Sequence, residues 1–253
     1  FEKYHIDEYF CFGEYVKDLF VRYNHNIKKY HFCGSFKYGL FYKSYLKNSN
    51  TRIEYDVCLL SQYVPSYFGD TSLLPVSWKN FGNNLFEFTK IISKYIKENE
   101  LIVCIALRSG KNNINSEKKF YKKHFGEKVI FSNRIHDVFS NYASAKKSKL
   151  CVTINSTIGR EIFGSGHKVL FINPFGEEWL KPVSDGPWYY SGNSYKEIFE
   201  KIKYLLTVNY EQYLSISKEE MKYIMNFDST TLPHKIIRKR IDKIIGDNIS
   251  SGA

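Results

Sequence analysis

A run of small polar residues between two apolar segments is the part of this sequence best suited to bind a ligand. Segment 150–154 reads LCVTI, Asn155, Ser156 and Thr157 follow it, and a second apolar segment spans Lys168–Ile172. This pattern predicts a buried strand, a polar turn, a short helix and another buried strand. The first N–H groups of a helix have no partner within the helix and carry partial positive charge. The turn is therefore suited to bind an anion such as phosphate, although an Asn or Ser here can also simply cap the helix.

Two more candidate ligands follow the most apolar segment of the chain, Leu101–Leu107. These are Arg108 and Ser109. An arginine guanidinium matches two phosphate oxygens at once, but an arginine on the surface can equally pair with a carboxylate. Ligands of α/β folds bind at the carboxyl ends of the strands. Arg108, Ser109 and the turn at Asn155 should therefore lie at the same edge of one sheet.

The elements that must position these residues alternate between strand and helix from Thr51 onward. The strands are expected at 55–60, 101–107, 128–131, 150–154 and 168–172, and the helices at 84–97, 117–124 and 137–146, with a long loop at 61–81. Continuously apolar strands are typical of a parallel sheet that is covered by helices on both faces. The fold class is therefore α/β, with a Rossmann-like domain that begins near Thr51.

The N-terminal segment predicts the remnant of a second α/β domain. A strand at 8–12, a helix at 14–23 and a strand at 30–33 precede a polar and aromatic segment at 37–50. The end of that segment, Lys47–Asn50, is the best linker candidate, because it holds small polar residues without apolar periodicity. The chain starts at Phe1 rather than Met, which indicates a fragment of a longer protein.

The C-terminal segment is helical. Amphipathic helices are expected at 195–206, 210–225 and 233–245, with no strand between them. Such helices can cover a sheet or reach back over a neighbouring domain. We therefore divide the chain into residues 1–50, the end of an N-terminal domain with its linker, and residues 51–253, a Rossmann-like domain with C-terminal helices.

Composition excludes a disordered chain and limits the choice of partners. Hydrophobic residues make up 43% of the chain, which suffices for a packed core. The net charge of +11 favours polyanions, anionic membrane surfaces or phosphorylated substrates. Because lysine is scattered rather than gathered in a dense basic block, we expect no specific nucleic-acid partner. Peripheral contact with an anionic membrane is at least as well supported.

Cysteine usage and hydropathy indicate a cytoplasmic protein. The five cysteines form no CxxC pair, so buried reduced thiols are expected and a metal site is not. No run of 18 apolar residues is present, so we expect no membrane-spanning helix, and a peripheral location at the inner face of the membrane remains compatible.

Several short motifs together resemble a known enzyme family. They are Phe12–Glu14, Phe32–Ser35, the segment 142–155, and Asn155–Glu161 leading to Gly166–Val169. Their order is similar to the C-terminal half of a glycosyltransferase of the GT-B fold. It is similar in particular to enzymes of bacterial surface-polysaccharide synthesis, including the Kdo-transferase and capsule-type groups. The resemblance implies a nucleotide-sugar donor above the strand ends of the second domain, with neither a metal nor another cofactor.

The resemblance also implies roles for the residues of the turn. Asn155, Ser156 and Thr157 would bind the donor nucleotide or its phosphate, together with the N–H groups of the helix start. Gly159 would allow a close approach of backbone or ligand. Glu161 would contact the ribose or base, or it would simply complement the helix dipole.

Three further residues are candidates for contact with the base or sugar. His136 and Asp137 follow the strand at 128–131, where a loop commonly faces the base, although Asp137 can instead cap a helix. Glu177 follows the strand at 168–172, where a solvated carboxylate is the simpler interpretation. The catalytic acid or base is not identified, because in this fold it often comes from the N-terminal domain.

Three classes of function remain open. The first is a glycosyltransferase that moves a sugar from a nucleotide donor to a growing surface polysaccharide or lipid-linked glycan, such as lipopolysaccharide or capsule. The preferred donor is CMP-Kdo, and a UDP-linked sugar is the second choice. The second is a polyol-phosphate transferase or a sugar-nucleotide epimerase of cell-envelope synthesis. The third is a non-catalytic module that binds a nucleotide or polyanion. A dinucleotide oxidoreductase is disfavoured, since no GxGxxG motif follows a strand.

Overall fold

The computed structural model describes residues 5–46, 51–68, 75–108, 110, 112–132 and 137–251, without the side chains of Trp179 and of 247–251. The chain forms two compact units. Unit 1 combines the first fifty residues with those from Ser217 onward, and unit 2 comprises Thr51–Ile216.

Unit 2 is built on a six-stranded parallel sheet. Its strands are β3 (Tyr55–Leu60), β4 (Val103–Ala106), β5 (Ile130–Phe131), β6 (Ser148–Thr153), β7 (Val169–Asn173) and β8 (Tyr189–Ser191). All neighbours are parallel, in the order β5-β4-β3-β6-β7-β8. The strand order therefore reverses between β3 and β6, which is the topology of doubly wound α/β folds. The predicted fold class is confirmed.

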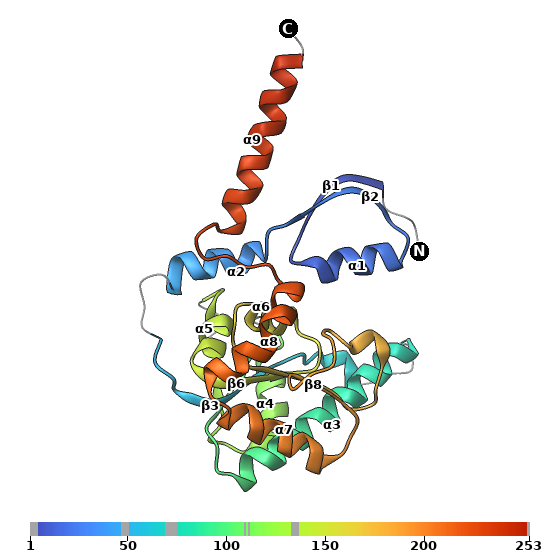
Figure 1. Ribbon diagram of the computed structural model, residues 1–253. Helices are drawn as coiled ribbons and strands as arrows, with labels where there is room; N and C mark the ends of the chain where they lie inside the picture. The colour runs from blue at the N-terminus through green and yellow to red at the C-terminus, as the bar shows by residue number, and fades with distance from the viewer. Residues whose placement is uncertain are drawn as a thin grey trace. The chain divides into compact units, whose positions relative to one another are not determined.

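Helices cover both faces of this sheet (Figure 1). On one side lie α3 (Val76–Glu98), α4 (Ile114–Phe125) and α7 (Tyr195–Thr207), and on the other α5 (Ser140–Lys146) and α6 (Thr157–Gly164). Because both faces are covered, β4 and β7 are buried along their whole length. The helix expected at 84–97 begins earlier, at Val76, so part of the expected loop is helical. The short 3₁₀ turns η2 (Pro65–Tyr67) and η3 (Glu178–Leu180) and strand β8 were not expected from local pattern.

Three cysteines form a row across the centre of the sheet. In the strand register, Cys58 of β3 lies beside Cys104 of β4 and beside Cys151 of β6. All three are at most 1% exposed. The five cysteines of the chain are buried free thiols, as expected from their apolar surroundings in the sequence.

Unit 1 contains a two-stranded parallel sheet with its crossover helix. Strands β1 (His5–Cys11) and β2 (Asn26–Phe32) flank α1 (Glu14–Arg22). The polar and aromatic segment after β2, for which no regular structure was predicted, forms α2 (Phe36–Phe41) and the π-helix η1 (Tyr42–Leu46). The Ser35 hydroxyl caps α2 by accepting from Tyr38 N at 3.1 Å, and the aromatic residues Tyr38 and Phe41 are buried. Residues 47–50, the expected linker, lie outside the described residues.

The C-terminal segment joins unit 1 through backbone contacts. Its helices are α8 (Tyr210–Ile224), which crosses the boundary between the units, and α9 (Pro233–Ser251). Asn226 N donates to Phe12 O at 2.8 Å, and Asn226 Nδ2 donates to Phe32 O at 3.0 Å. At Gly34, whose φ is +76°, a Cβ would lie 2.9 Å from the Asn226 carbonyl oxygen. The tail was assigned to the second domain from the sequence, whereas in the structure its part from Ser217 onward packs with the first fifty residues.

Along the described part of the chain, no helix is both long enough and apolar enough to cross a bilayer.

Candidate functional site

The loops that follow β3, β4 and β6 meet where the strand order reverses. β3 and β6 are hydrogen-bonded neighbours at this point, and β4 pairs with β3 on its other side. The residues at the three carboxyl ends are Ser61 and Gln62 after β3, Arg108 after β4, and the turn Asn155–Thr157 after β6. In doubly wound sheets, ligands bind in the crevice at this reversal.

The side chain of the N-cap residue of α6 does not cap the first turn of the helix. Ser156 is the N-cap residue and has an extended backbone (φ −77°, ψ 133°), but its hydroxyl makes no capping hydrogen bond. Thr157, the first residue of the helix, is exposed. The simpler interpretation of Ser156 as a cap therefore does not describe this conformation. A hydroxyl beside uncapped helical N–H groups is suited to bind an anion.

Gln62 connects two of the three loops. Its side-chain Oε1 accepts from Asn155 N at 2.8 Å and from the Thr153 hydroxyl at 3.3 Å. These bonds fix the end of β6 and the first residue of the turn relative to β3. Gln62 was not among the predicted residues, although it follows a buried strand closely, as Arg108 does.

Arg108 belongs to the same network. Its Nη1 donates to the Gln62 carbonyl oxygen at 3.3 Å, and its side chain is exposed. None of the ion pairs formed within the described residues includes Arg108. Its guanidinium is thus bonded to a neutral backbone oxygen, and a cationic group of this kind is suited to bind phosphate. Arg108 and the turn at Asn155, which were selected separately, both contact Gln62. Ser109 lies outside the described residues.

A fully buried glutamate connects the loops that follow β3 and β4. Glu117 of α4 is 0% exposed, and its Oε1 accepts from Arg108 N at 2.9 Å and from the Ser61 hydroxyl. The hydroxyl of Tyr121, one turn along the same helix, donates to Ser61 Oγ at 2.9 Å. Burial raises the pKa of Tyr121, so this hydroxyl remains a donor. No local pattern in the sequence distinguishes Glu117 from an ordinary residue of a first helical turn.

A second set of hydrogen bonds holds the end of β4 against β5 and α5. Ser132 Oγ accepts from Leu107 N at 2.9 Å and donates to Asn141 Oδ1 at 2.8 Å, while Asn141 Nδ2 donates to Leu107 O at 2.8 Å. Asp137 Oδ1 accepts from Phe139 N at 2.8 Å, which stabilises the turn into α5. Asp137 was expected to cap the helix, but the N-cap residue of α5 is Phe139, so Asp137 stabilises the turn before the helix instead. The neighbouring His136 lies outside the described residues.

Two of the predicted ligand-binding residues of α6 make contacts within the protein. Glu161 is 3% exposed and accepts from the Tyr142 hydroxyl of α5 at 2.6 Å. A Cβ at Gly159 would lie 2.8 Å from Cγ2 of Thr153, so the glycine allows α6 to pack closely on the sheet. Both residues hold α6 in position in this structure. A contact of Glu161 with a ribose would require its bond with Tyr142 to be exchanged.

Glu177 lies after β7, one strand further from the reversal. Its Oε1 accepts from Asn80 Nδ2 of α3 at 3.0 Å. Its backbone is held by Asn173, which donates from Nδ2 to Glu177 O at 2.8 Å and accepts at Oδ1 from Glu177 N at 3.2 Å. The side chain is therefore fixed at the carboxyl edge of the sheet, where it bonds to the amide of Asn80.

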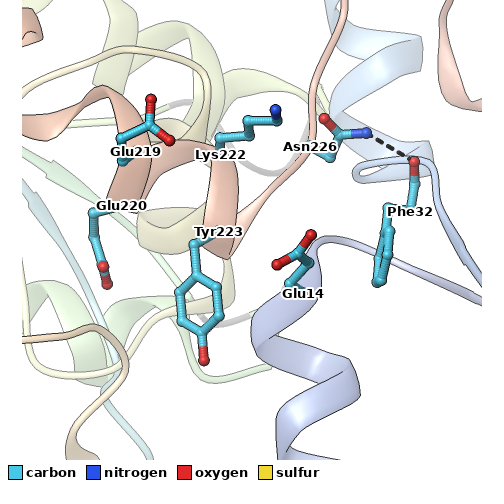
Figure 2. Close-up of a pocket in the computed structure, with 7 residues that line it drawn as sticks. All are labelled: Glu14, Phe32, Glu219, Glu220, Lys222, Tyr223 and Asn226. Carbon is cyan, nitrogen blue, oxygen red and sulfur yellow. Dashed lines mark hydrogen bonds between the residues drawn. The ribbon is translucent and has the colours of Figure 1, made fainter.

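Unit 1 has a pocket of about 410 Å³ near the ends of β1 and β2 (Figure 2). It is lined by Glu14, Phe32, Glu219, Glu220, Lys222, Tyr223 and Asn226. In Figure 2, Glu14 lies at the start of α1, opposite the side chains of α8, and a dashed line marks the bond from Asn226 to Phe32. Three carboxylates give this pocket an excess of hydrogen-bond acceptors.

Two acidic residues of strand β1, in the small sheet of unit 1, are bound to cationic side chains of the same unit. Asp7 pairs with Lys28 at 2.6 Å. Glu8 is bonded to both nitrogens of the Arg240 fork and, at 2.7 Å, to His31 Nε2. The hydrogen bond from Arg240, and then that from His31, lowers the pKa of Glu8 to about 2. Glu14, in contrast, faces the pocket.

Comparison with family models identifies the group of proteins to which this sequence is related. Residues 1–240 match a family described as "putative O-antigen biosynthesis protein". This chain belongs to that family. Its predicted place in surface-polysaccharide synthesis is confirmed at this level, while the family description states neither a reaction nor a substrate.

Comparison with solved structures gives a distant likeness. One match is described as a "putative UDP-N-acetylglucosamine 2-epimerase from Listeria monocytogenes", with 13% identity and a TM-score of 0.44. The match covers 82% of this chain and 48% of that structure, so this chain spans about half of its length. A likeness this low carries no argument about activity. No curated protein matches the sequence.

Proposed function

We propose that this member of the O-antigen family binds a nucleotide-sugar donor in unit 2 and acts in glycosyl transfer to a surface polysaccharide or a lipid-linked glycan. The observation that carries the proposal is that Arg108 and Asn155, just before the start of α6, both bond to Gln62 at the reversal of the strand order, while Ser156 makes no capping bond. Ser156, Thr157 and the first N–H groups of α6 would bind the donor phosphate, and Arg108 would add a cationic fork.

The chemistry of glycosyl transfer fits this arrangement. When the bond between the sugar and the nucleotide breaks, negative charge develops on the departing phosphate oxygen. Donors that are already oriented toward that oxygen stabilise it more in the transition state than in the ground state. Gln62 and Glu117 are positioning residues in this proposal, because they hold the loops that carry Asn155 and Arg108.

The nucleotide of the donor is the finer part of the proposal. The resemblance noted from the sequence favours a CMP-linked acidic sugar such as Kdo over a UDP-linked sugar. Arg108 and the helix start would recognise phosphate, which both donors share. Asp137 and Glu177 are the candidates for contact with the base or sugar, since Glu161 is buried and bonded to Tyr142.

Thermal unfolding in the presence of nucleotides tests the proposal. A ligand at one hundred times its dissociation constant stabilises the folded protein by about 2.7 kcal/mol. We expect CMP or UDP to raise the melting temperature, and NAD not to. If no nucleotide or nucleotide sugar raises it, the assignment of this site is wrong.

Product analysis then separates the competing reactions. A glycosyltransferase releases the nucleotide only when a glycan acceptor is supplied, whereas an epimerase changes the sugar with no acceptor present. A protein that binds the nucleotide without either reaction would be the non-catalytic module considered above.

A further inference from the structure

Helix α9 of unit 1 has one face of isoleucines that is largely exposed. Ile237, Ile241, Ile244 and Ile245 follow a spacing of four, three and one, which places them on one side of a helix. The last three are 47%, 37% and 53% exposed. Isolated exposed apolar residues are common, but a row of them on one helix face indicates a surface that is covered in the functional state.

The opposite face of α9 carries a row of lysines. Lys235, Lys239 and Lys243 are each separated by one helical turn, so neighbouring ammonium groups repel one another. None of the three takes part in an ion pair among the described residues. On α3, by contrast, Lys90 and Lys94 have glutamate neighbours, Glu87 and Glu98, each at 3.8 Å.

The helix is held in place on its remaining sides. Arg240 binds Glu8 of β1 through both arms of its guanidinium. The pair of Arg238 with Asp242 at 3.6 Å lies within the helix and does not anchor it. At its start, the ring of Pro233 lies against Gly39 of α2, where a Cβ would be 2.8 Å from Pro233 Cδ. α9 is thus anchored to unit 1 while its isoleucine row is exposed, so little ordering is needed before the row binds a partner.

We propose that α9 binds the surface of an anionic lipid bilayer. The isoleucine row would enter the boundary between headgroups and acyl chains, and the lysine stems would extend so that their ammonium groups reach anionic headgroups. This inference is independent of the nucleotide site proposed for unit 2.

Charge is the reason to favour a bilayer over other partners. From Pro233 to Gly246 the helix carries five lysines and arginines and one aspartate, Asp242. Pairing this helix with a second copy would bring two strongly cationic surfaces together. A hydrophilic polyanion, such as a nucleic acid or an acidic glycan, would satisfy the lysines but leave the isoleucines exposed. An anionic lipid bilayer offers acyl chains to the isoleucine row and anionic headgroups to the lysine row.

Flotation of the full chain with lipid vesicles tests the proposal. We expect binding to vesicles of phosphatidylcholine mixed with phosphatidylglycerol, weakening as salt increases, and little binding to phosphatidylcholine alone. Replacing two exposed isoleucines together, Ile241→Asn and Ile245→Asn, should lower the vesicle partition coefficient at least tenfold, on the order expected for lost burial of two such side chains. Equal binding to both vesicle types would contradict the proposal.

A matched pair of lysine variants separates α9 from the general positive charge of the protein. The triple variant Lys235→Gln, Lys239→Gln, Lys243→Gln should weaken binding by roughly fivefold per lysine. The control removes the same charge from α4, through Lys118→Gln, Lys119→Gln and Lys123→Gln, and should change binding by less than about twofold. Similar losses in both variants would overturn the assignment to α9.

Two further measurements keep the result interpretable. Circular dichroism melting shows whether each variant is folded. If the isoleucine variant is unfolded, the lysine variant still tests the proposal. Light scattering after size-exclusion chromatography gives the molar mass in solution. If the wild-type protein is a dimer and the isoleucine variant is a monomer that still floats, a second copy covers α9 and the bilayer proposal is wrong.

Discussion

The carboxyl ends of the parallel strands carry opposite chemistry in the two units. In unit 2 the loops present N–H groups and hydroxyls at the turn Asn155–Thr157 and a guanidinium at Arg108, and Gln62 accepts bonds from both loops. In unit 1 the corresponding edge borders a pocket with the carboxylates of Glu14, Glu219 and Glu220. In α/β folds ligands bind at the carboxyl ends of the strands, so the parallel topology predicts the position of a candidate site in both units. The residues that follow each strand determine which charge is accepted: donors attract a phosphate, and carboxylates repel it and favour hydroxyl or cationic groups.

The two edges also differ in how firmly they are built. In unit 2 a buried carboxylate, Glu117, holds two loops through hydrogen bonds that water does not reach. In unit 1 the pocket glutamates lie at the surface, with Glu219 exposed. Substitutions at the two edges should therefore have very different consequences for stability.

The largest expected effect is on the folding of unit 2. Glu117→Ala leaves Ser61 and Arg108 N without their buried acceptor and should lower the free energy of unfolding by about 3 kcal/mol. Urea unfolding monitored by circular dichroism measures this free energy of unfolding. The matched variant Glu219→Ala, in the unit 1 pocket, should change it by less than about 0.5 kcal/mol. Comparable losses would show that the two edges are equally rigid.

The second effect is on ligand binding at the unit 2 edge. Replacing both hydroxyls, Ser156→Ala and Thr157→Ala, should remove about 2 kcal/mol of nucleotide binding, because each lost bond to an anion is worth roughly 1 kcal/mol or more. Isothermal titration calorimetry measures the change in dissociation constant.

The control for that prediction comes from the acidic edge. Glu14→Gln should leave the dissociation constant for the nucleotide within about twofold of the wild-type value, since Glu14 belongs to the other unit and binds no part of the proposed phosphate site. A stronger effect of Glu14→Gln than of the Ser156 and Thr157 variant would reverse the assignment of the anion site.

A smaller effect is expected at Gln62. Gln62→Ala removes the acceptor for Asn155 N and should weaken nucleotide binding by about 1 kcal/mol while direct phosphate ligands remain in place. Gln62→Glu keeps the side-chain oxygen but adds a negative charge beside the phosphate site, so it should weaken binding more than the alanine variant. If Gln62→Glu binds as tightly as the wild type, no anion occupies this position.

The smallest effect concerns the acid sensitivity of unit 1. The pKa of Glu8 is about 2 in the folded protein, against 4.5 for an unperturbed glutamate. The stabilisation from its bonds with Arg240 and His31 is therefore fully present above about pH 5 and is lost as the pH falls toward 2. Melting temperatures measured from pH 7 to pH 2 should decline less steeply in Glu8→Gln than in the wild type. An identical slope in both proteins would mean that Glu8 is not held in this way.

Local pattern was sufficient for most strands and helices of unit 2, although β8 and the first part of α3 were not predicted. The apolar run from Val57 to Leu60 is buried, because removing apolar side chains from water is the main driving force of folding and a continuous run can do so only inside a covered sheet. The turn Asn155–Thr157 and Arg108 were recognisable because polar residues directly after such runs must lie at a strand end. The sequence by itself thus determined the parallel α/β class and the edge that carries the candidate anion site.

Only the tertiary structure decided which distant residues hold that edge together. Gln62 bonds to Asn155, and Glu117 to Ser61, across separations of 93 and 56 residues. The tail joins unit 1 through Asn226, which bonds to Phe32 across 194 residues. Such bonds depend on donor and acceptor positions that are set by the packing of the whole sheet, and periodicity within a short window contains no information about them.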